Sequence, residues 1–400
     1  MRRIIFLFFT ASLLSCGTHR DELKTGRWRG LIEMQGQHLP FNFDVTRDTA
    51  GYKVYLRNGD EKLLLDEITM IGDSVNMVLH IFDAALRANI EDGKLSGYFI
   101  RNYAKDRFPF TAAYGQDFRF AKAGNASQDF SGKYAVRFFS KKDTAVSVGI
   151  FAQKDNHVTG TFLMADGDYR YLEGNVVNGR LMLSTFDGNH AYLFAATKSG
   201  DTLKGDFFAG KSSHKTWIGI RNEKAMMPDP ESLTYLKPGY EKIDFSFPDL
   251  SKKKVSPSDP RYKNKVLILQ ISGTWCPNCM DETRFLAPWY KENQKRGVEI
   301  IGLAYERKDD FDYASSRVKK MKEKMGVDYE VLIAGVNDNA KAAQTLPALN
   351  AVLGFPTTIF IGKDGKVKRI HTGFSGPGTG IYYDQFKQRF NEIVNELLKD

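Results

Sequence analysis

Two cysteines three positions apart are the residues of this chain best suited to chemistry. Cys276 and Cys279 enclose Pro277 and Asn278, and a continuous apolar run, residues 266–271, ends shortly before them. Such a run bounded by glycine predicts a strand buried on both faces. Proline is favoured at the first position of a helix, so a helix is predicted to begin at Pro277. Cys276 then caps this helix, and Cys279 lies about one turn inside it on the same face.

A sulfur at the start of a helix is stabilised as a thiolate. The free backbone amides and the positive end of the helix dipole favour the ionised form of Cys276. In Cys-X-X-Cys motifs at helix starts the thiol pKa falls to roughly 3.5–7.5, so the sulfur is nucleophilic near neutral pH. Cys279 can then attack the mixed disulfide that forms. The spacing predicts dithiol–disulfide exchange through a Cys276–Cys279 disulfide, with no cofactor beyond the redox-active cysteine pair.

The alternative for such a pair is half of a structural zinc site. Zinc requires four ligands, usually from two Cys-X-X-Cys pairs. The chain has three cysteines, and the third, Cys16, lies in a predicted targeting segment. The seven histidines are scattered, and no two of them have ligand spacing. We therefore expect no metal site.

Length and composition indicate a globular protein of two or three domains. The chain has 400 residues, of which 42% are hydrophobic and 26% charged. Its formal net charge of +9 is modest for this length, and the basic residues form no arginine-rich stripe. The run Lys252-Lys253-Lys254 fits a solvated loop better than a nucleic-acid patch. We expect no nucleic-acid partner.

Residues 1–15 have the pattern of a secretory signal peptide. Arg2 and Arg3 precede an apolar run, residues 4–9, that is too short to span a bilayer permanently. The segment ends in the letters LLSCG, which resemble a bacterial lipobox. That resemblance implies cleavage before Cys16 and lipidation of Cys16. We therefore expect the cell envelope of a bacterium, with the protein lipid-anchored and facing the periplasm or exterior; the alternatives are an uncleaved anchor or plain secretion.

Residues 16–25 are predicted to form a polar tether, and an all-β region follows. From residue 26 to about residue 221, short aromatic and β-branched segments alternate with Gly, Asp and Asn turns. The pattern repeats after about 100 residues, because Gly132-Lys133-Tyr134 echoes Gly26-Arg27-Trp28 and residues 200–207 echo residues 92–99. We predict two related antiparallel β-meanders, barrel-like or sandwich-like, of about eight strands each, over residues 26–122 and 123–224. Their many Tyr and Phe residues fit core packing better than a partner or ligand surface.

A linker rich in Pro and Gly, residues 225–241, precedes an α/β domain over residues 242–400. In this domain buried strands alternate with helices, which predicts a three-layer α/β fold. The predicted strands are residues 266–271, 298–303, 329–333, 357–361 and 366–370, and the predicted helices are residues 277–295, 311–324, 340–346 and 383–398.

Trp275 before the cysteine pair, and the stretch Gly354-Phe355-Pro356-Thr357-Thr358 before a hairpin, resemble thioredoxin. More narrowly, residues 242–400 resemble the TlpA/ResA-like exported thiol–disulfide oxidoreductases. The resemblance implies a cis peptide bond at Pro356, facing the dithiol, with neighbouring backbone that pairs with a substrate chain. Trp275, Phe355 and Pro277 would line that substrate site. The alternative is a trans proline at the start of an edge strand.

The resemblance also assigns a role to Glu282. In this subfamily a glutamate three residues after the second cysteine lies beneath the dithiol, where desolvation would raise its pKa and let it exchange protons with Cys279. Thioredoxin has a buried aspartate on the preceding strand, whereas this chain has Gln270, which cannot titrate. The alternative for Glu282 is a solvated carboxylate in the first helical turn. Arg284 stands where relatives often have Pro, so no helix bend is predicted there.

The resemblance favours reduction of disulfides in exported proteins over three other functions. A peroxiredoxin needs a Thr that two intervening residues separate from its cysteine, but only one residue separates Thr274 from Cys276. A copper chaperone needs a different cysteine spacing and a distal His, for which His371 is the candidate. The third alternative is a surface binding lipoprotein whose β-region recognises a partner or ligand. We expect a reduction potential below about −200 mV. In an oxidising compartment such a reductase needs a membrane electron donor.

Overall fold

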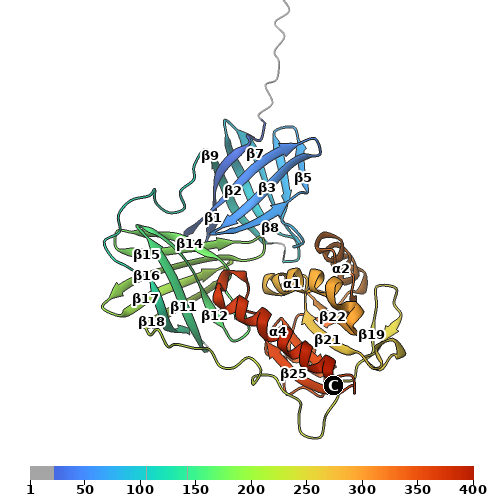
Figure 1. The fold of residues 1–400 in the computed structure, drawn as a ribbon. Coiled ribbons are helices and arrows are strands. Elements are labelled where there is room, and N and C mark those ends of the chain that lie inside the picture. The colour runs from blue at the N-terminus through green and yellow to red at the C-terminus, as the bar shows by residue number, and fades with distance from the viewer. Residues whose placement is uncertain (1–21, 105, 142) are drawn as a thin grey trace, which may run out of the picture.

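Three bodies of secondary structure meet near helix α1 in the computed structural model (Figure 1), which describes residues 22–104, 106–141 and 143–400. The predicted signal peptide and Cys16 lie outside the described residues. Within those residues, no helix combines the length and the apolar character needed to cross a membrane.

The first body is an antiparallel sheet with strand order β4-β3-β2-β1-β9-β8-β7-β6-β5, called the first sheet below. Its side chains alternate between buried and exposed along β9, as expected for strands with one face on a core. The strands are β1 Gly26–Met34, β2 Gln37–Asp48, β3 Gly51–Asn58, β4 Glu61–Leu65, β5 Ile68–Ile71, β6 Ser74–Val78, β7 Ala84–Glu91, β8 Lys94–Arg101 and β9 Asp106–Tyr114.

The second body, called the second barrel, has strand order β11-β10-β18-β17-β16-β15-β14-β12-β13, and an additional β11–β12 pairing closes it. The strands are β10 Gly132–Phe139, β11 Thr144–Lys154, β12 His157–Met164, β13 Gly167–Asp168, β14 Leu172–Val177, β15 Arg180–Phe186, β16 Ala191–Ser199, β17 Thr202–Ala209 and β18 Ser213–Arg221.

Each β-rich body has nine strands, so the expectation of about eight was one strand short. The short strands explain the difference: β5 has four residues and β13 has two, which is too little for a recognisable alternating pattern. The aromatic residues fill the interiors, as expected for core packing, since Trp28, Phe41, Tyr134 and Trp217 are at most 1% exposed.

The C-terminal domain contains a five-stranded mixed sheet of order β23-β22-β21-β24-β25. Strands β21, β22 and β23 run parallel, while β24 and β25 are antiparallel to their neighbours. The elements are β19 Phe247–Pro248, β20 Lys254–Val255, β21 Val266–Ser272, α1 Pro277–Asn293, β22 Val298–Glu306, α2 Phe311–Met325, β23 Glu330–Val336, α3 Asn339–Thr345, β24 Thr357–Ile361, β25 Val367–Thr372 and α4 Ile381–Lys399, with 3-10 turns at Pro260–Tyr262, Gln294–Arg296 and Pro377–Thr379.

Strand β21 is buried at every position, as its continuous apolar sequence predicts, and it leads into the turn that carries the cysteines. Helix α1 packs on α4 through aromatic rings; the centroids of Phe285 and Phe390 are 5.1 Å apart. The hydrophobic core of this domain also includes Ile81 and Phe82 from the turn after β6. The C-terminal domain therefore shares its core with the first sheet.

Candidate active site

Cys276 and Cys279 occupy the predicted positions at the start of α1 and are joined by a disulfide bond. Their Cα atoms are 5.2 Å apart. Cys276 is the N-cap, and the backbone amide of Cys279 donates to its Sγ over 3.1 Å. Cys276 is 5% exposed and Cys279 is fully buried. A backbone amide in this position favours the thiolate form of the sulfur that it faces.

The loop before β24 faces the dithiol. The Phe355–Pro356 peptide bond is cis, as the resemblance implies. The carbonyl oxygen of Phe355 lies 3.4 Å from Cys276 Sγ, and its ring packs edge-on against Trp275 at a centroid distance of 5.5 Å. Pro277 is buried at the first position of α1. The predicted substrate-binding residues therefore surround Cys276.

Glu282 is fully buried, which excludes the alternative of a solvated carboxylate. Its two carboxylate oxygens accept hydrogen bonds from the Gln270 side-chain amide at 2.8 Å and from the Thr358 hydroxyl at 2.6 Å. The Tyr329 hydroxyl in turn donates to Gln270 Oε1 over 3.2 Å. Because burial outweighs these hydrogen bonds, the pKa of Glu282 rises to about 7. Gln270 thus orients an acid that can hold or release a proton near neutral pH.

A second buried carboxyl, Glu306, holds the turn that leads to Cys276. It accepts from the backbone amide and the hydroxyl of Thr274, both at 2.8 Å. Burial raises the pKa of Glu306 to about 7. We did not single out Glu306 from the sequence, although it ends the strand parallel to β21. Parallel strands end at the same edge of a sheet, and this rule points to Glu306.

Both β-rich bodies reach the dithiol. The Arg307 guanidinium lies over the rings of Trp275 and of Tyr103, which follows β8 of the first sheet, and donates to Asn189 of the second barrel over 3.0 Å. The Asn278 side chain donates to the carbonyl oxygen of Asp168 in the second barrel over 3.0 Å. The sequence did not indicate these contacts, since they join segments far apart in the chain.

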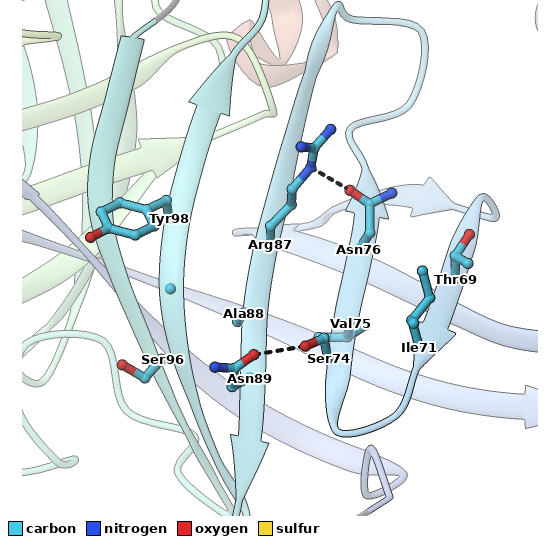
Figure 2. A pocket seen from close by; sticks show the side chains of 11 residues that line it. Thr69, Ile71, Ser74, Val75, Asn76, Arg87, Ala88, Asn89, Ser96 and Tyr98 are labelled. Atoms are coloured by element: carbon cyan, nitrogen blue, oxygen red, sulfur yellow. Dashed lines mark hydrogen bonds between the residues drawn. The ribbon is translucent and has the colours of Figure 1, made fainter.

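Two other features, His371 and a hollow on the first sheet, lie apart from the dithiol. Among the described residues no group of three or more His, Cys, Asp and Glu side chains could hold a metal ion. His371 packs on the ring of Phe386, and its burial lowers its pKa to about 4. A hollow of about 590 Å³ lies on β5–β8, and Figure 2 shows the side chains that line it. Two of them are exposed apolar residues, Ile71 at 76% and Tyr98 at 48%. All residues that line this hollow belong to the first sheet.

The comparisons with known proteins converge on the C-terminal domain. A family model described as "AhpC/TSA family" matches residues 238–370. The thiol-disulfide oxidoreductase ResA of Bacillus anthracis is 32% identical over 150 residues, which are 38% of this chain and 76% of that relative. ResA of Geobacillus thermodenitrificans is 31% identical over 130 residues, which are 32% of this chain and 66% of the relative. The chain thus spans just under two thirds of the length of this last relative.

Solved structures are also similar to this chain. A thioredoxin family thiol:disulfide interchange protein from Chlorobium tepidum TLS covers 40% of this chain and 95% of its own, with 23% identity and a TM-score of 0.30. A thiol-disulfide oxidoreductase from Bacteroides fragilis covers 37% and 99%, with 19% identity and a TM-score of 0.28. These scores add nothing to the assignment, which depends on the sequence relatives. Through its C-terminal domain, the chain belongs to the thioredoxin-like family of ResA thiol-disulfide oxidoreductases.

Proposed function

We propose that this protein reduces disulfide bonds of other exported proteins through the Cys276–Cys279 dithiol. The proposal rests on the position of the Cys276 sulfur. This sulfur accepts a hydrogen bond from the Cys279 backbone amide and faces the carbonyl oxygen of Phe355. Membership of the ResA family supports the same chemistry. The Thr274 hydroxyl donates to Glu306, so it is already engaged and does not serve a peroxidatic sulfur.

The reaction balances as two exchange steps. The Cys276 thiolate attacks one sulfur of the substrate disulfide, forming a mixed disulfide and expelling the other substrate sulfur, which takes up a proton. Cys279 then loses its proton, with the Glu282 carboxylate as acceptor, and attacks the Cys276 sulfur. The second substrate sulfur leaves as a thiolate and takes up a proton, and Glu282 releases its own. Two electrons have then passed from the dithiol to the substrate. A membrane electron donor then reduces the Cys276–Cys279 disulfide back to the dithiol.

The proposal includes the location of the protein in the cell. The lipobox-like letters before Cys16 support export and a lipid anchor, and the exported character of the resembled enzymes supports the cell envelope of a bacterium. The compartment is oxidising, so the protein needs a continuous supply of electrons to act as a reductase. We propose a reduction potential below about −200 mV.

Trapping tests the proposal. A Cys279→Ala variant retains the nucleophile but cannot resolve the mixed disulfide, so Cys276 should accumulate covalent adducts with exported proteins that reductant releases. A Cys276→Ser, Cys279→Ala variant is the matched control and should trap none. Equilibration of the wild type in glutathione buffers gives the potential. Absence of adducts, or a potential at the oxidising end of the thioredoxin-like scale, would contradict the proposal.

The hollow on the first sheet favours a second candidate, recognition of a partner through the β-rich region. Ile71 and Tyr98 at this hollow are the kind of exposed apolar residues that mark binding surfaces. The Cys276→Ser, Cys279→Ala variant separates the two functions. A binding protein keeps its biological role in this variant, whereas a reductase loses it.

A further inference from the structure

A turn of the second barrel holds the two residues between the cysteines. Asp168, in β13, accepts from the Asn278 side chain at 3.0 Å through its backbone carbonyl. The Arg170 guanidinium donates to the Pro277 carbonyl oxygen over 3.2 Å. Asp168 and Arg170 are 5% and 3% exposed, so water does not compete for these bonds. The dipeptide that separates Cys276 from Cys279 is therefore bonded to another body of the protein.

The turn fits closely onto glycines of the C-terminal domain. A Cβ atom at Gly354, next to Phe355, would lie 2.4 Å from Asp166 Cβ, and one at Gly373 would lie 2.9 Å from the Ala165 carbonyl oxygen. The Gly376 amide donates to the Asp168 carboxylate over 2.7 Å. Only residues without a side chain allow this approach. The contact is thus a closely fitted interface, in which glycine backbone of the C-terminal domain meets both backbone and side chains of the turn.

Charges link all three bodies at this point. Arg170 pairs with Asp281 of α1, with Glu61 of the first sheet, and with Asp187 of the second barrel at 3.2 Å. Asp281 lies in the second turn of the helix that Cys276 caps, and it also pairs with Arg284 at 2.5 Å. Arg170 therefore places a positive charge between the Pro277 carbonyl and a carboxylate on the helix of the dithiol.

We propose that Asp168 and Arg170 are positioning residues of the dithiol, which hold Pro277 and Asn278 and thereby set the thiolate stability and reduction equilibrium of Cys276. The proposal rests on the proposed dithiol exchange and assigns a part of it to the second barrel. In related motifs, the stability of the reduced form sets the oxidising power of the pair. Here that stability depends on side chains from outside the C-terminal domain.

The sign of the effect follows from the charges. A cation near the start of α1 stabilises the Cys276 thiolate. Without Arg170, the carboxylates of Glu61, Asp187 and Asp281 lose a shared positive charge, and their negative charge destabilises the thiolate. Replacing Arg170 with methionine should raise the pH at which Cys276 becomes reactive by about one unit. It should also shift the equilibrium with glutathione about tenfold towards the disulfide, since the reduced form loses its stabilisation. Tenfold corresponds to about 30 mV for this two-electron couple, in the reducing direction.

The test uses the full chain and two readouts that a merely structural residue would not move. These are the pH dependence of iodoacetamide labelling of Cys276 and the dithiol fraction in glutathione buffers. Arg119→Met is the matched control: Arg119 is 3% exposed, pairs with Glu173 at 2.8 Å, and bonds only residues of the β-rich bodies among the contacts of the described chain. We expect this control to match the wild type in both readouts.

Arg170→Lys keeps the test decisive if Arg170→Met does not fold. Lysine retains the charge but lacks the planar guanidinium that reaches Pro277 and Asp281 together. We therefore expect Arg170→Lys to shift the equilibrium with glutathione about threefold towards the disulfide. Wild-type values in a folded Arg170→Met, or in Arg170→Lys if only that variant folds, would overturn the proposal. Failure of the proposed function looks different, because the wild type itself would then not equilibrate with glutathione and the Cys279→Ala variant would trap no adducts.

Discussion

Replacing Glu282 with glutamine tests whether this buried carboxyl sets how the dithiol handles protons. Burial raises its pKa from the ordinary 4.5 to about 7, which corresponds to about 3 kcal/mol of unfolding free energy. The folded-state pKa is the higher one, so the folded protein binds more protons than the unfolded chain between these values. The contribution to stability is fully present below pH 4.5 and is lost as the pH rises through about 7.

Glutamine preserves the shape and most of the hydrogen bonds at this position. Its amide oxygen can accept from Gln270, and its amide nitrogen can donate to Thr358 once that hydroxyl rotates. Glu282→Gln should therefore lose the pH dependence that Glu282 causes. Relative to wild type, the variant should gain up to about 3 kcal/mol of unfolding free energy between pH 4.5 and pH 8.

Two assays on the oxidised and reduced protein check this. Urea unfolding at a series of pH values gives the stability difference. The rate of disulfide exchange over the same range should show an inflection near pH 7 in the wild type that is absent in Glu282→Gln. Glu292→Gln, at an exposed position of the same helix, is the control and should follow the wild type. Superimposable stability and rate profiles for Glu282→Gln and wild type would refute the reasoning.

Three further predictions concern the turn, the nucleophile and the anchor. Thr274→Val removes the hydroxyl bound to the buried Glu306 carboxylate and should cost about 1–3 kcal/mol in urea unfolding; an unchanged midpoint would show that this bond contributes nothing. In the reduced protein at low pH, iodoacetamide should label Cys276 well before Cys279, because Cys276 alone receives the helix amide; equal rates across pH would reject the thiolate assignment. Cys16→Ser should move the protein from the membrane fraction to the soluble one, and unchanged fractionation would rule out the lipid anchor.

The part of the site that the sequence predicts is the part that local rules control. Pro277 at a helix start fixes where Cys276 and Cys279 lie, and three residues of helix then bring Glu282 to the same region. Glu306 lies one strand away and follows from the rule that parallel strands end together, but only once the strand order is known. The burial of Glu282 against Gln270 agrees with the expectation that Gln270 replaces a titrating residue.

The contribution of the β-rich bodies could not be predicted in the same way. Hydrophobic alternation reports which side of a strand faces a core, and it identified an all-β region correctly. It says nothing about which turn of that region docks on another domain. Asp168 and Arg170 lie more than 100 residues before the cysteines. Asp168 belongs to a strand of only two residues, and Arg170 follows that strand. Nothing in the sequence distinguishes Arg170 from an ordinary surface charge. In the structure it is buried, which its ion pair with Asp281 permits.

The hydrogen bond between Arg170 and the Pro277 carbonyl also links the docking of the second barrel to the state of the dithiol. Free-energy coupling between two equilibria is reciprocal. Whatever factor the docked barrel contributes to the oxidation of the dithiol, oxidation contributes the same factor to the docking of the barrel. If the second barrel sets the reduction equilibrium as proposed, each oxidation of Cys276 and Cys279 changes how firmly the second barrel is held. A partner that senses the arrangement of the bodies can then read the redox state without touching either sulfur.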